Sequence, residues 1–193
     1  MAHRLLTIGH STHPVERFIA LLRQHGVTAV ADVRSAPYSR HVPQYSRDAL
    51  RAQLARQGID YVFLGQELGA RPSDEACYVD GRVDFARLAR TPAFRAGLAR
   101  VVTGTSTHVV AVMCAERDPL DCHRMILVCR HLRGRVPEIG HVLADGSLEP
   151  HADAERRLVV LTGLEAPHLF SSQVDLVERA YDVQSARIAF SLE

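Results

Sequence analysis

Residues 5–33, with the sequence LLTIGHSTHPVERFIALLRQHGVTAVADV, decide the fold class. Residues 5–9 form a short apolar run typical of a buried strand, and residues 14–24 carry apolar side chains at helical spacing. Residues 27–33 are again apolar and rich in valine and alanine, as expected of a second strand. Two strands separated by a helix of this length favour a parallel pair, so this stretch predicts an α/β protein.

The alternation of strands and helices continues along the chain. Apolar runs predict further strands at residues 61–64, 108–113 and 138–143, and helical spacing predicts helices at residues 46–57, 92–102, 122–133, 154–161 and 174–186. The dipeptide Asp145-Gly146 is typical of a tight hairpin turn and predicts an antiparallel edge. The sequence therefore predicts a single doubly wound domain, with a mostly parallel open sheet of four or five strands, flanking helices and a small antiparallel edge hairpin.

The predicted elements divide the chain into two parts. Residues 1–162 hold every predicted strand and form the α/β domain. Residues 163–193 are predicted to be a C-terminal helical extension that packs on the domain or on a partner subunit, which admits a homodimer. Within these parts we expect a loop at residues 65–81 and a linker at residues 165–168, because both stretches are rich in turn-forming or helix-breaking residues.

Composition excludes several classes of protein. The chain has 193 residues, of which 47% are hydrophobic and 23% charged, as in an ordinary globular protein. No apolar run is long enough to span a bilayer and no export signal is visible, so we expect a cytoplasmic protein whose four cysteines are free thiols. The net charge of +1 lacks the basic excess of a general nucleic-acid binder, so any anion must be recognised locally.

Polar residues follow three of the predicted strands directly. In an open α/β sheet, ligands bind at the carboxyl ends of the strands, so these positions are the first candidates for a site. The three segments are Gly9-His10-Ser11, Asp32-Val33-Arg34 and Cys114-Ala115-Glu116. A purely structural interpretation stays open, in which Asp32 and Arg34 pair locally and Ser11 satisfies free backbone donors.

The loop at residues 35–45 is long for a connection between a strand and a helix. It contains Tyr38, Arg40, His41 and Tyr45. Arginine with interleaved aromatic side chains can hold a phosphate and stack on a base, and long ordered loops are often functional. The alternative explanation is that these residues form an ordinary solvent-exposed turn with no binding role.

Residues 114–124, with the sequence CAERDPLDCHR, are the most informative segment for chemistry. We expect Asp121 to cap a helix whose first turn contains Cys122, His123 and Arg124. The helix dipole and Arg124 would favour the thiolate of Cys122, and the free backbone donors there would suit an oxyanion. Cys129, seven residues later, is expected to be a core residue.

The same segment also permits a metal site. Cys114, Cys122, His123 and His10 carry suitable ligand atoms. Adjacent cysteine and histidine with a lone cysteine eight positions earlier do not match the paired spacing of structural zinc sites, however. Neither a metal nor any other cofactor is therefore predicted.

Several motifs follow one another along the chain. They are Thr7-Ile8-Gly9-His10-Ser11, Asp32-Val33-Arg34-Ser35 with Pro37 and Ser39-Arg40, Tyr61 with Leu64 and Leu68-Gly69, and Cys114-Ala115-Glu116 with Cys122-His123-Arg124. In this order they resemble the family called domain of unknown function 488. The resemblance covers residues 3 to about 160 and implies an α/β fold with a shared polar site. Ala70 departs from the expected pattern, which has a second glycine after Gly69. The family's name assigns no activity.

These observations lead to one hypothesis and two alternatives. The leading hypothesis is an enzyme that acts on an anionic small molecule or nucleotide at the carboxyl ends of the strands. Cys122 would be the nucleophile or a polarised thiol, His123 or His10 the general acid and base, and Glu116 or Asp32 would orient the histidine. The expected substrate-binding residues are Ser11, Arg34, Arg40, Tyr45, Cys114 and Arg124. The first alternative is a non-catalytic module that binds a ligand or, less favoured, nucleic acid. The second is a structural polar network.

Overall fold

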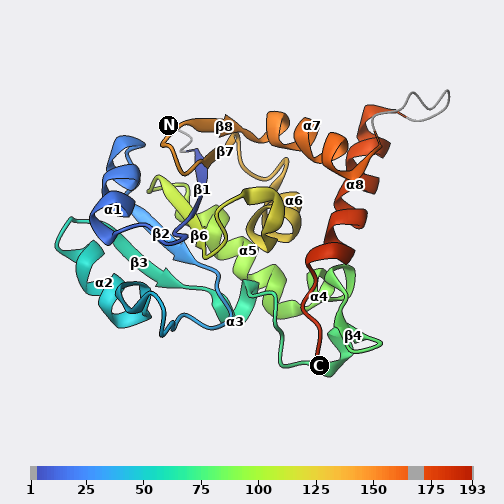
Figure 1. The fold of residues 1–193 in the computed structure, drawn as a ribbon, viewed down its shortest axis with the longest axis horizontal. Helices are drawn as coiled ribbons and strands as arrows, with labels where there is room; N and C mark the ends of the chain where they lie inside the picture. The colour runs from blue at the N-terminus through green and yellow to red at the C-terminus, as the bar shows by residue number, and fades with distance from the viewer. Residues whose placement is uncertain (1–3, 165–171, 193) are drawn as a thin grey trace.

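A six-stranded sheet forms the centre of the protein. The computed structural model describes residues 4–164 and 172–192 (Figure 1). The strands are ordered β3-β2-β6-β1-β7-β8, and every pairing is parallel except that of β7 with β8. Their bounds are β1 Leu5–Gly9, β2 Ala29–Asp32, β3 Asp60–Phe63, β6 Val110–Cys114, β7 Ile139–Val142 and β8 Leu148–Pro150. The predicted doubly wound, mostly parallel sheet with an antiparallel edge hairpin is therefore confirmed.

Helices cover both faces of this sheet (Figure 1). One face packs on α1 (Val15–Gln24) and α2 (Arg47–Ala55), which supply the apolar side chains of one core cluster. The other face packs on α5 (Pro92–Gly104), a π-helix η4 (Arg124–Cys129) that continues into α6 (Arg130–Leu132), and α7 (His151–Thr162).

Strand β6 shows why the residues at the centre of the sheet are apolar without alternation. Val110 and Val112 belong to the core cluster on one face, whereas Ala111 and Met113 belong to the cluster on the other face. Side chains alternate between the two faces of a strand, so a strand covered by helices on both sides needs an apolar residue at every position. This is the pattern that marked residues 108–113 in the sequence.

The loop predicted at residues 65–81 is wrong in part, because this stretch contains short regular elements. They are α3 (Gly65–Leu68), a 3-10 turn η2 (Glu75–Cys77) and β4 (Tyr78–Val79), which pairs with β5 (Arg82–Val83) and is followed by α4 (Phe85–Arg90). The hairpin turns at Asp80-Gly81, where both residues have positive φ, 47° and 74°. The Asp-Gly dipeptide was therefore a usable signal here, but two-residue strands are too short to show a period.

The C-terminal segment returns to the domain and ends beside the β4–β5 hairpin (Figure 1). Helix α8 (Gln173–Ile188) buries Val177, Ala180 and Tyr181 in the core, and Phe190 then accepts a backbone hydrogen bond from Val83 at 2.9 Å. The linker predicted at residues 165–168 lies outside the described residues. Within the described part of the chain, no helix is both long and apolar enough to cross a bilayer.

Gly9 ends β1 at a point where another backbone comes unusually close. A Cβ at this position would lie 1.8 Å from the carbonyl oxygen of Glu116, so no residue with a side chain fits without a shift of that loop. The glycine therefore allows the segment after β6 to lie over the end of β1, where His10 donates its backbone N–H to the carbonyl of Cys114, the last residue of β6, and Ser11 donates to that of Ala115.

Gly9→Ala is therefore expected to lower the free energy of unfolding by roughly 1–3 kcal/mol, because the added methyl group displaces a packed backbone. Gly104→Ala is the matched control, since its Cβ would meet its nearest neighbour, the Val110 side chain, at 3.4 Å. This control should change stability by no more than about 1 kcal/mol. Urea denaturation of both variants measures the difference, and equal stabilities would contradict the close approach at Gly9.

Candidate functional site

A cavity lies where the connections of two neighbouring strands leave the sheet in opposite directions. After β2 the chain passes to α2 on one face, and after β6 it passes to η4 on the other face. Such a switch point is the usual ligand crevice of a doubly wound sheet. The cavity has a volume of about 430 Å³ and is lined by Arg34, Ser35, Ala36, Tyr38, Ala70, Arg71, Cys114, Ala115, Glu116, Asp121, His123, Ile188 and Phe190.

Arg34 is held in place by a buried network on the β2 side of the cavity. Its Nε donates to Asp32 Oδ1 at 2.9 Å, and its Nη2 donates to Asp32 Oδ2 at 2.6 Å and to the Tyr45 carbonyl at 2.8 Å. Tyr61 completes the shell of Asp32 by donating its hydroxyl to Oδ2 at 2.7 Å. Asp32 thus orients an arginine, and not a histidine as the sequence hypothesis had it.

His10 belongs to the same network. Its Nδ1 is 2.8 Å from the Ser11 carbonyl, its Nε2 accepts from Arg34 Nη1 at 3.2 Å, and its ring stacks on Tyr45 at a centroid distance of 4.1 Å. This arrangement defines a neutral imidazole with its proton on Nδ1. Burial, together with the charge of Arg34, lowers the pKa of His10 to about 4. Both ring nitrogens are therefore occupied, and neither is free to act as an acid or base.

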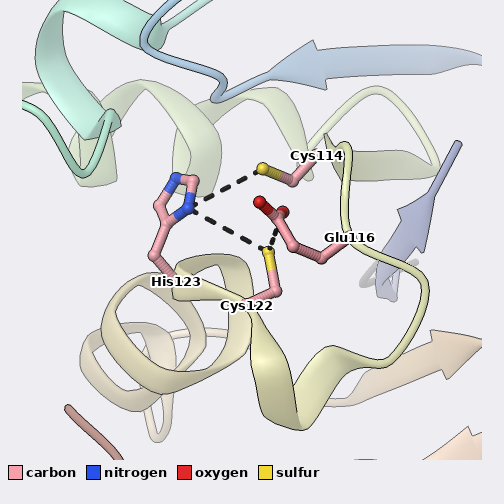
Figure 2. Close-up of side chains that lie close together, drawn as sticks. All are labelled: Cys114, Glu116, Cys122 and His123. Carbon is pink, nitrogen blue, oxygen red and sulfur yellow. Dashed lines mark hydrogen bonds between the residues drawn. The ribbon is translucent and has the colours of Figure 1, made fainter. Parts of the chain in front are cut away.

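Four metal-ligand or nucleophile side chains meet on the β6 side of the cavity. Figure 2 shows Cys114 at the end of β6, Glu116 in the loop after it, and Cys122 and His123 where the next helix starts. His123 Nδ1 lies 3.7 Å from Cys114 Sγ and 4.0 Å from Cys122 Sγ, and Cys122 Sγ lies 2.9 Å from Glu116 Oε2. One ligand atom from each of the four residues lies within 4.8 Å of the others.

A change of backbone conformation turns Cys122 and His123 toward the same point. Cys122 is extended, with φ −134° and ψ 137°, and its carbonyl accepts the backbone N–H groups of Met125 and Ile126. His123 already has helical angles, φ −60° and ψ −21°. Cys122 is thus the residue before the helix, not a member of its first turn.

The predicted cap at Asp121 is wrong. Asp121 is the last residue of a 3-10 turn, η3 (Pro119–Asp121), which is capped by the side chain of Asp118. Asp121 instead lines the cavity. The Cys122 sulfur takes the place of a capping side chain, because it accepts the backbone N–H of Arg124 at 3.4 Å.

Arg124 is fully buried and does not line the cavity. Its guanidinium donates to the Glu116 carbonyl from Nη1 at 2.6 Å and to the Arg117 carbonyl from Nη2 at 3.1 Å, while its Nε has no hydrogen-bond partner in the described part of the chain. Arg124 therefore holds the loop after β6 in place and brings a positive charge beneath the cluster. Arg124 was expected among the substrate-binding residues, and this placement does not match that expectation.

The cluster is electrostatically coupled. Burial alone would raise the pKa of Cys122, but the hydrogen bond with Cys114 and the charges of Arg124 and His123 hold it well below its usual range. Burial would likewise lower the pKa of His123, but contact with Cys122 raises it. Cys114, by contrast, keeps its proton because burial raises its pKa.

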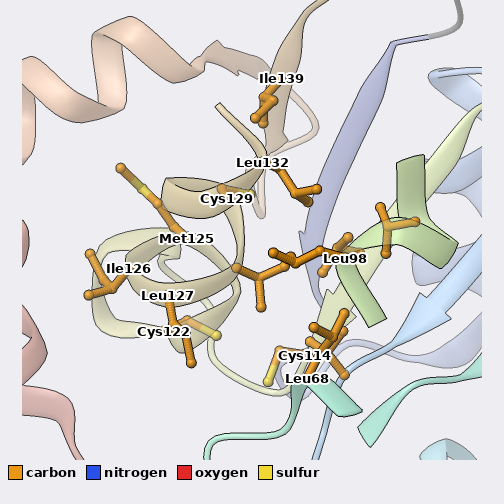
Figure 3. Close-up of a cluster of buried hydrophobic side chains, with 14 of the residues drawn as sticks. Leu68, Leu98, Cys114, Cys122, Met125, Ile126, Leu127, Cys129, Leu132 and Ile139 are labelled. Carbon is orange, nitrogen blue, oxygen red and sulfur yellow. The ribbon is translucent and has the colours of Figure 1, made fainter. Parts of the chain in front are cut away.

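Cys129 and Cys77 are outside this cluster. Figure 3 shows Cys129 among apolar side chains of the core, and burial raises its pKa to about 12. Cys77 is also buried, in η2. The placement of Cys129 is the core position expected from the sequence.

The remaining predicted substrate-binding residues lie away from the cavity wall. Ser11 and Tyr45 support His10 and Arg34 through their carbonyl groups, and Arg40 is exposed on the loop after β2. Conversely, sequence reasoning missed Arg71 and Phe190, which form part of the wall with the guanidinium 4.4 Å from the ring centroid. Arg71 follows the Leu68-Gly69 motif closely, so its place in the chain was a usable signal. Phe190 had none.

Fold and site together define a doubly wound α/β protein with a Cys–Glu–Cys–His cluster at the carboxyl edge of its sheet. The model of the family "Domain of unknown function DUF488" matches residues 14–130, which is more than half of the chain, so the protein belongs to this family. The match is shorter than the expected 3 to about 160. It includes Asp32, Arg34 and the cluster but not β7, α7 or α8. Searches of curated proteins and of solved structures found no match.

Asp32→Asn is expected to destabilise the protein by about 3–5 kcal/mol, because it leaves the buried charge of Arg34 without its partner. Asp48→Asn is the control, since the Arg47–Asp48 pair is solvent-exposed and should contribute less than about 1 kcal/mol. Chemical denaturation measures both variants. If Asp32→Asn were as mild as the control, Arg34 would not depend on this pair.

His10 should make stability depend on pH. Between pH 6.5 and about 4 the unfolded chain binds a proton at His10 and the folded chain does not, so acidification favours unfolding. Relative to pH 7, this group should cost roughly 2–3 kcal/mol at pH 4.5. His10→Gln can keep both hydrogen bonds and should reduce the loss of stability by that amount, whereas the exposed control His41→Gln should not. Urea melts at the two pH values give the comparison.

Proposed function

We propose that this chain is an enzyme that acts on an anionic small molecule or nucleotide bound in the cavity between β2 and β6. The observation that carries the proposal is the composition of the wall: an oriented arginine stands on one side and the Cys–Glu–Cys–His cluster on the other. Groups that bind an anion and groups that can react with it are thus presented to the same space.

Arg34 offers one N–H to a ligand. A guanidinium has five N–H donors, and Arg34 uses four of them on Asp32, Tyr45 and His10. The fifth, on Nη1, remains for a group in the cavity, and the four other bonds hold it at a fixed orientation. Because the Arg34 side chain is already ordered, less conformational entropy is lost when a ligand binds.

Arg71 supplies the net positive charge that the cavity needs for an anion. The charge of Arg34 is compensated by Asp32, and no acidic residue forms an ion pair with Arg71 among the described residues. Arg71 is exposed and lies against the Phe190 ring, which leaves its polar edge free for a phosphate or carboxylate. Tyr38, which is 59% exposed at the same cavity, provides a face on which a base can stack.

The size of the cavity favours a small molecule over a polymer. About 430 Å³ falls within the range of small-molecule sites. A net charge of +1 also provides little attraction for an extended polyanion. The non-catalytic nucleic-acid module is therefore the weaker interpretation of the same residues.

The cluster, and not a single thiol, is the reactive centre in this proposal. Cys114, Glu116 and His123 line the cavity, whereas Cys122 is only 1% exposed and does not. A nucleophile must be reached by its substrate, so the placement of Cys122 behind its neighbours argues against direct attack by its sulfur. Its role is to act through the cluster.

A ligand search tests the enzyme against the binding module. Mass spectrometry of what remains bound after gentle purification identifies candidate ligands, and incubation of each with the protein shows whether it is chemically altered. An enzyme is supported if the wild type converts the ligand, and if Cys114→Ser still binds the ligand but no longer converts it. Binding without any conversion would overturn the enzymatic proposal and leave the ligand-binding module.

Arg71→Ala is expected to weaken binding of the anion about tenfold, which corresponds to the loss of one charge-assisted contact. Arg117→Ala is the matched control, because Arg117 is an exposed arginine of the loop after β6 that does not line the cavity. Calorimetric titration with nucleoside monophosphates and inorganic phosphate, at two salt concentrations, measures both variants. Equal weakening by the two substitutions would contradict a specific site at Arg71.

A further inference from the structure

We propose that Cys114, Glu116, Cys122 and His123 bind a single divalent ion of the zinc class, with Glu116 as an exchangeable ligand on the cavity side. This inference deepens the proposed function and rests on it for its catalytic meaning, because a bound cation would supply a Lewis acid beside the anion site. The binding of the ion itself is a separate property of the four side chains.

The donor atoms have the types and spacings that such an ion needs. Two sulfurs, one imidazole nitrogen and one carboxylate oxygen are a donor set of zinc proteins. Bond lengths in tetrahedral zinc sites imply sulfur–nitrogen separations of about 3.5 Å. The observed separations of His123 Nδ1 from the two sulfurs are 3.7 and 4.0 Å, so only small side-chain rotations are needed (Figure 2).

His123 is already oriented as a metal ligand requires. Its Nε2 is 3.1 Å from the Val33 carbonyl and donates its proton there, so Nδ1 is the nitrogen that faces Cys114 and Cys122 and would bind the ion in place of a proton. Ligating histidines commonly give their other ring N–H to a carbonyl or carboxylate, which fixes the tautomer and orients the ring.

The net charge of the loaded cluster would offset that of Arg124. Arg124 is fully buried, and among the described residues its guanidinium donates only to neutral carbonyl groups. A buried charge without a counter-charge is costly. Two thiolates, one carboxylate and one divalent cation carry a net charge of −1, which balances Arg124. The cation would therefore allow all three anionic groups to be ionised together in a largely buried place.

The spacing that argued against zinc in the sequence is accounted for by the backbone. Consecutive residues of one helix or one strand point in different directions, so adjacent Cys122 and His123 would not meet on a regular element. Here Cys122 is extended and His123 is helical, and both side chains reach the same point. The backbone N–H of Arg124 also bonds the Cys122 sulfur, which favours a thiolate ligand.

The burial of the four residues points to a reactive site and not to a purely structural one. Cys114, Cys122 and His123 are buried, whereas Glu116 is exposed and lines the cavity. Three fixed protein ligands with a replaceable fourth position are the arrangement of catalytic zinc sites. An anionic substrate held by Arg71 and Arg34 could displace the Glu116 carboxylate.

Cobalt substitution tests the site through a spectroscopic signal. The full chain is freed of metal with a chelator and titrated with Co²⁺. One equivalent should bind with the visible bands of tetrahedral cobalt and a near-ultraviolet sulfur-to-cobalt band. Cys114→Ser and Cys122→Ser should each reduce the sulfur band and weaken binding by more than the roughly 10–100-fold cost of removing a partner of a ligand. Cys77→Ser, a cysteine outside the cluster, should leave both unchanged.

A second measurement uses only the wild type, so it remains valid if the cysteine variants fail to fold. Alkylation of the native wild-type chain, mapped by mass spectrometry with and without one equivalent of Zn²⁺, should show protection of Cys114, the cysteine that lines the cavity. The proposal is overturned if the wild type binds no Co²⁺ with a sulfur band, or if Zn²⁺ fails to slow alkylation of Cys114.

The metal and the proposed function fail in distinguishable ways. If the ion binds but the cavity takes no anion, the metal site stands and the proposed enzyme falls. If the metal-free chain binds an anion and converts it equally well, the proposed enzyme stands. The ion is then not part of its reactive centre. Glu116→Gln tests whether Glu116 is itself a ligand of the ion or only supports the other ligands. If it is a ligand, the variant should keep the sulfur band but alter the visible cobalt bands.

Discussion

The parallel pairing of β6 between β2 and β1 is the constraint on which the rest of the site depends. In this register Cys114 lies opposite Gly9, and Asp32 lies opposite Met113, so three strands end at nearly the same level. The polar residues that follow them must then share one edge of the sheet. Because Gly9 has no side chain, the loop after β6 can lie directly over β1 and return Cys122 and His123 toward Cys114.

The two buried arginines of the site, Arg34 and Arg124, differ in how their charges are compensated. Arg34 is paired with Asp32, and the surrounding bonds from His10, Tyr45 and Tyr61 leave it rigid and nearly neutral as a unit. Among the residues that the structure describes, Arg124 has no carboxylate partner, and its charge acts on the Cys122 sulfur while its guanidinium holds the loop that carries Glu116. One arginine is thus a positioned donor, and the other is a buried charge that must be balanced by the anions of the cluster.

The C-terminal helices complete the wall of a cavity that the matched family region begins. A buried chain of hydrogen bonds runs from Thr7 through His141 and His151 to Tyr181, and so ties α8 to the central strand β1. From that anchor the chain passes to Phe190, which stacks on Arg71 at the mouth of the cavity. The shape of the site therefore depends on residues beyond those that the family model covers.

The sequence alone determined the α/β architecture, the positions of the main strands along the chain and the segments in which site residues lie, because local periodicity and strand ends report burial on nearby faces. It could not decide which polar side chains face the cavity. Arg124 and Arg34 look alike in the chain, yet one turns under a loop and the other toward the ligand space. His10 accepts a hydrogen bond from Arg34 and does not line the cavity, whereas Phe190, far along the chain, does. These outcomes depend on packing between distant segments, which only the tertiary structure decided.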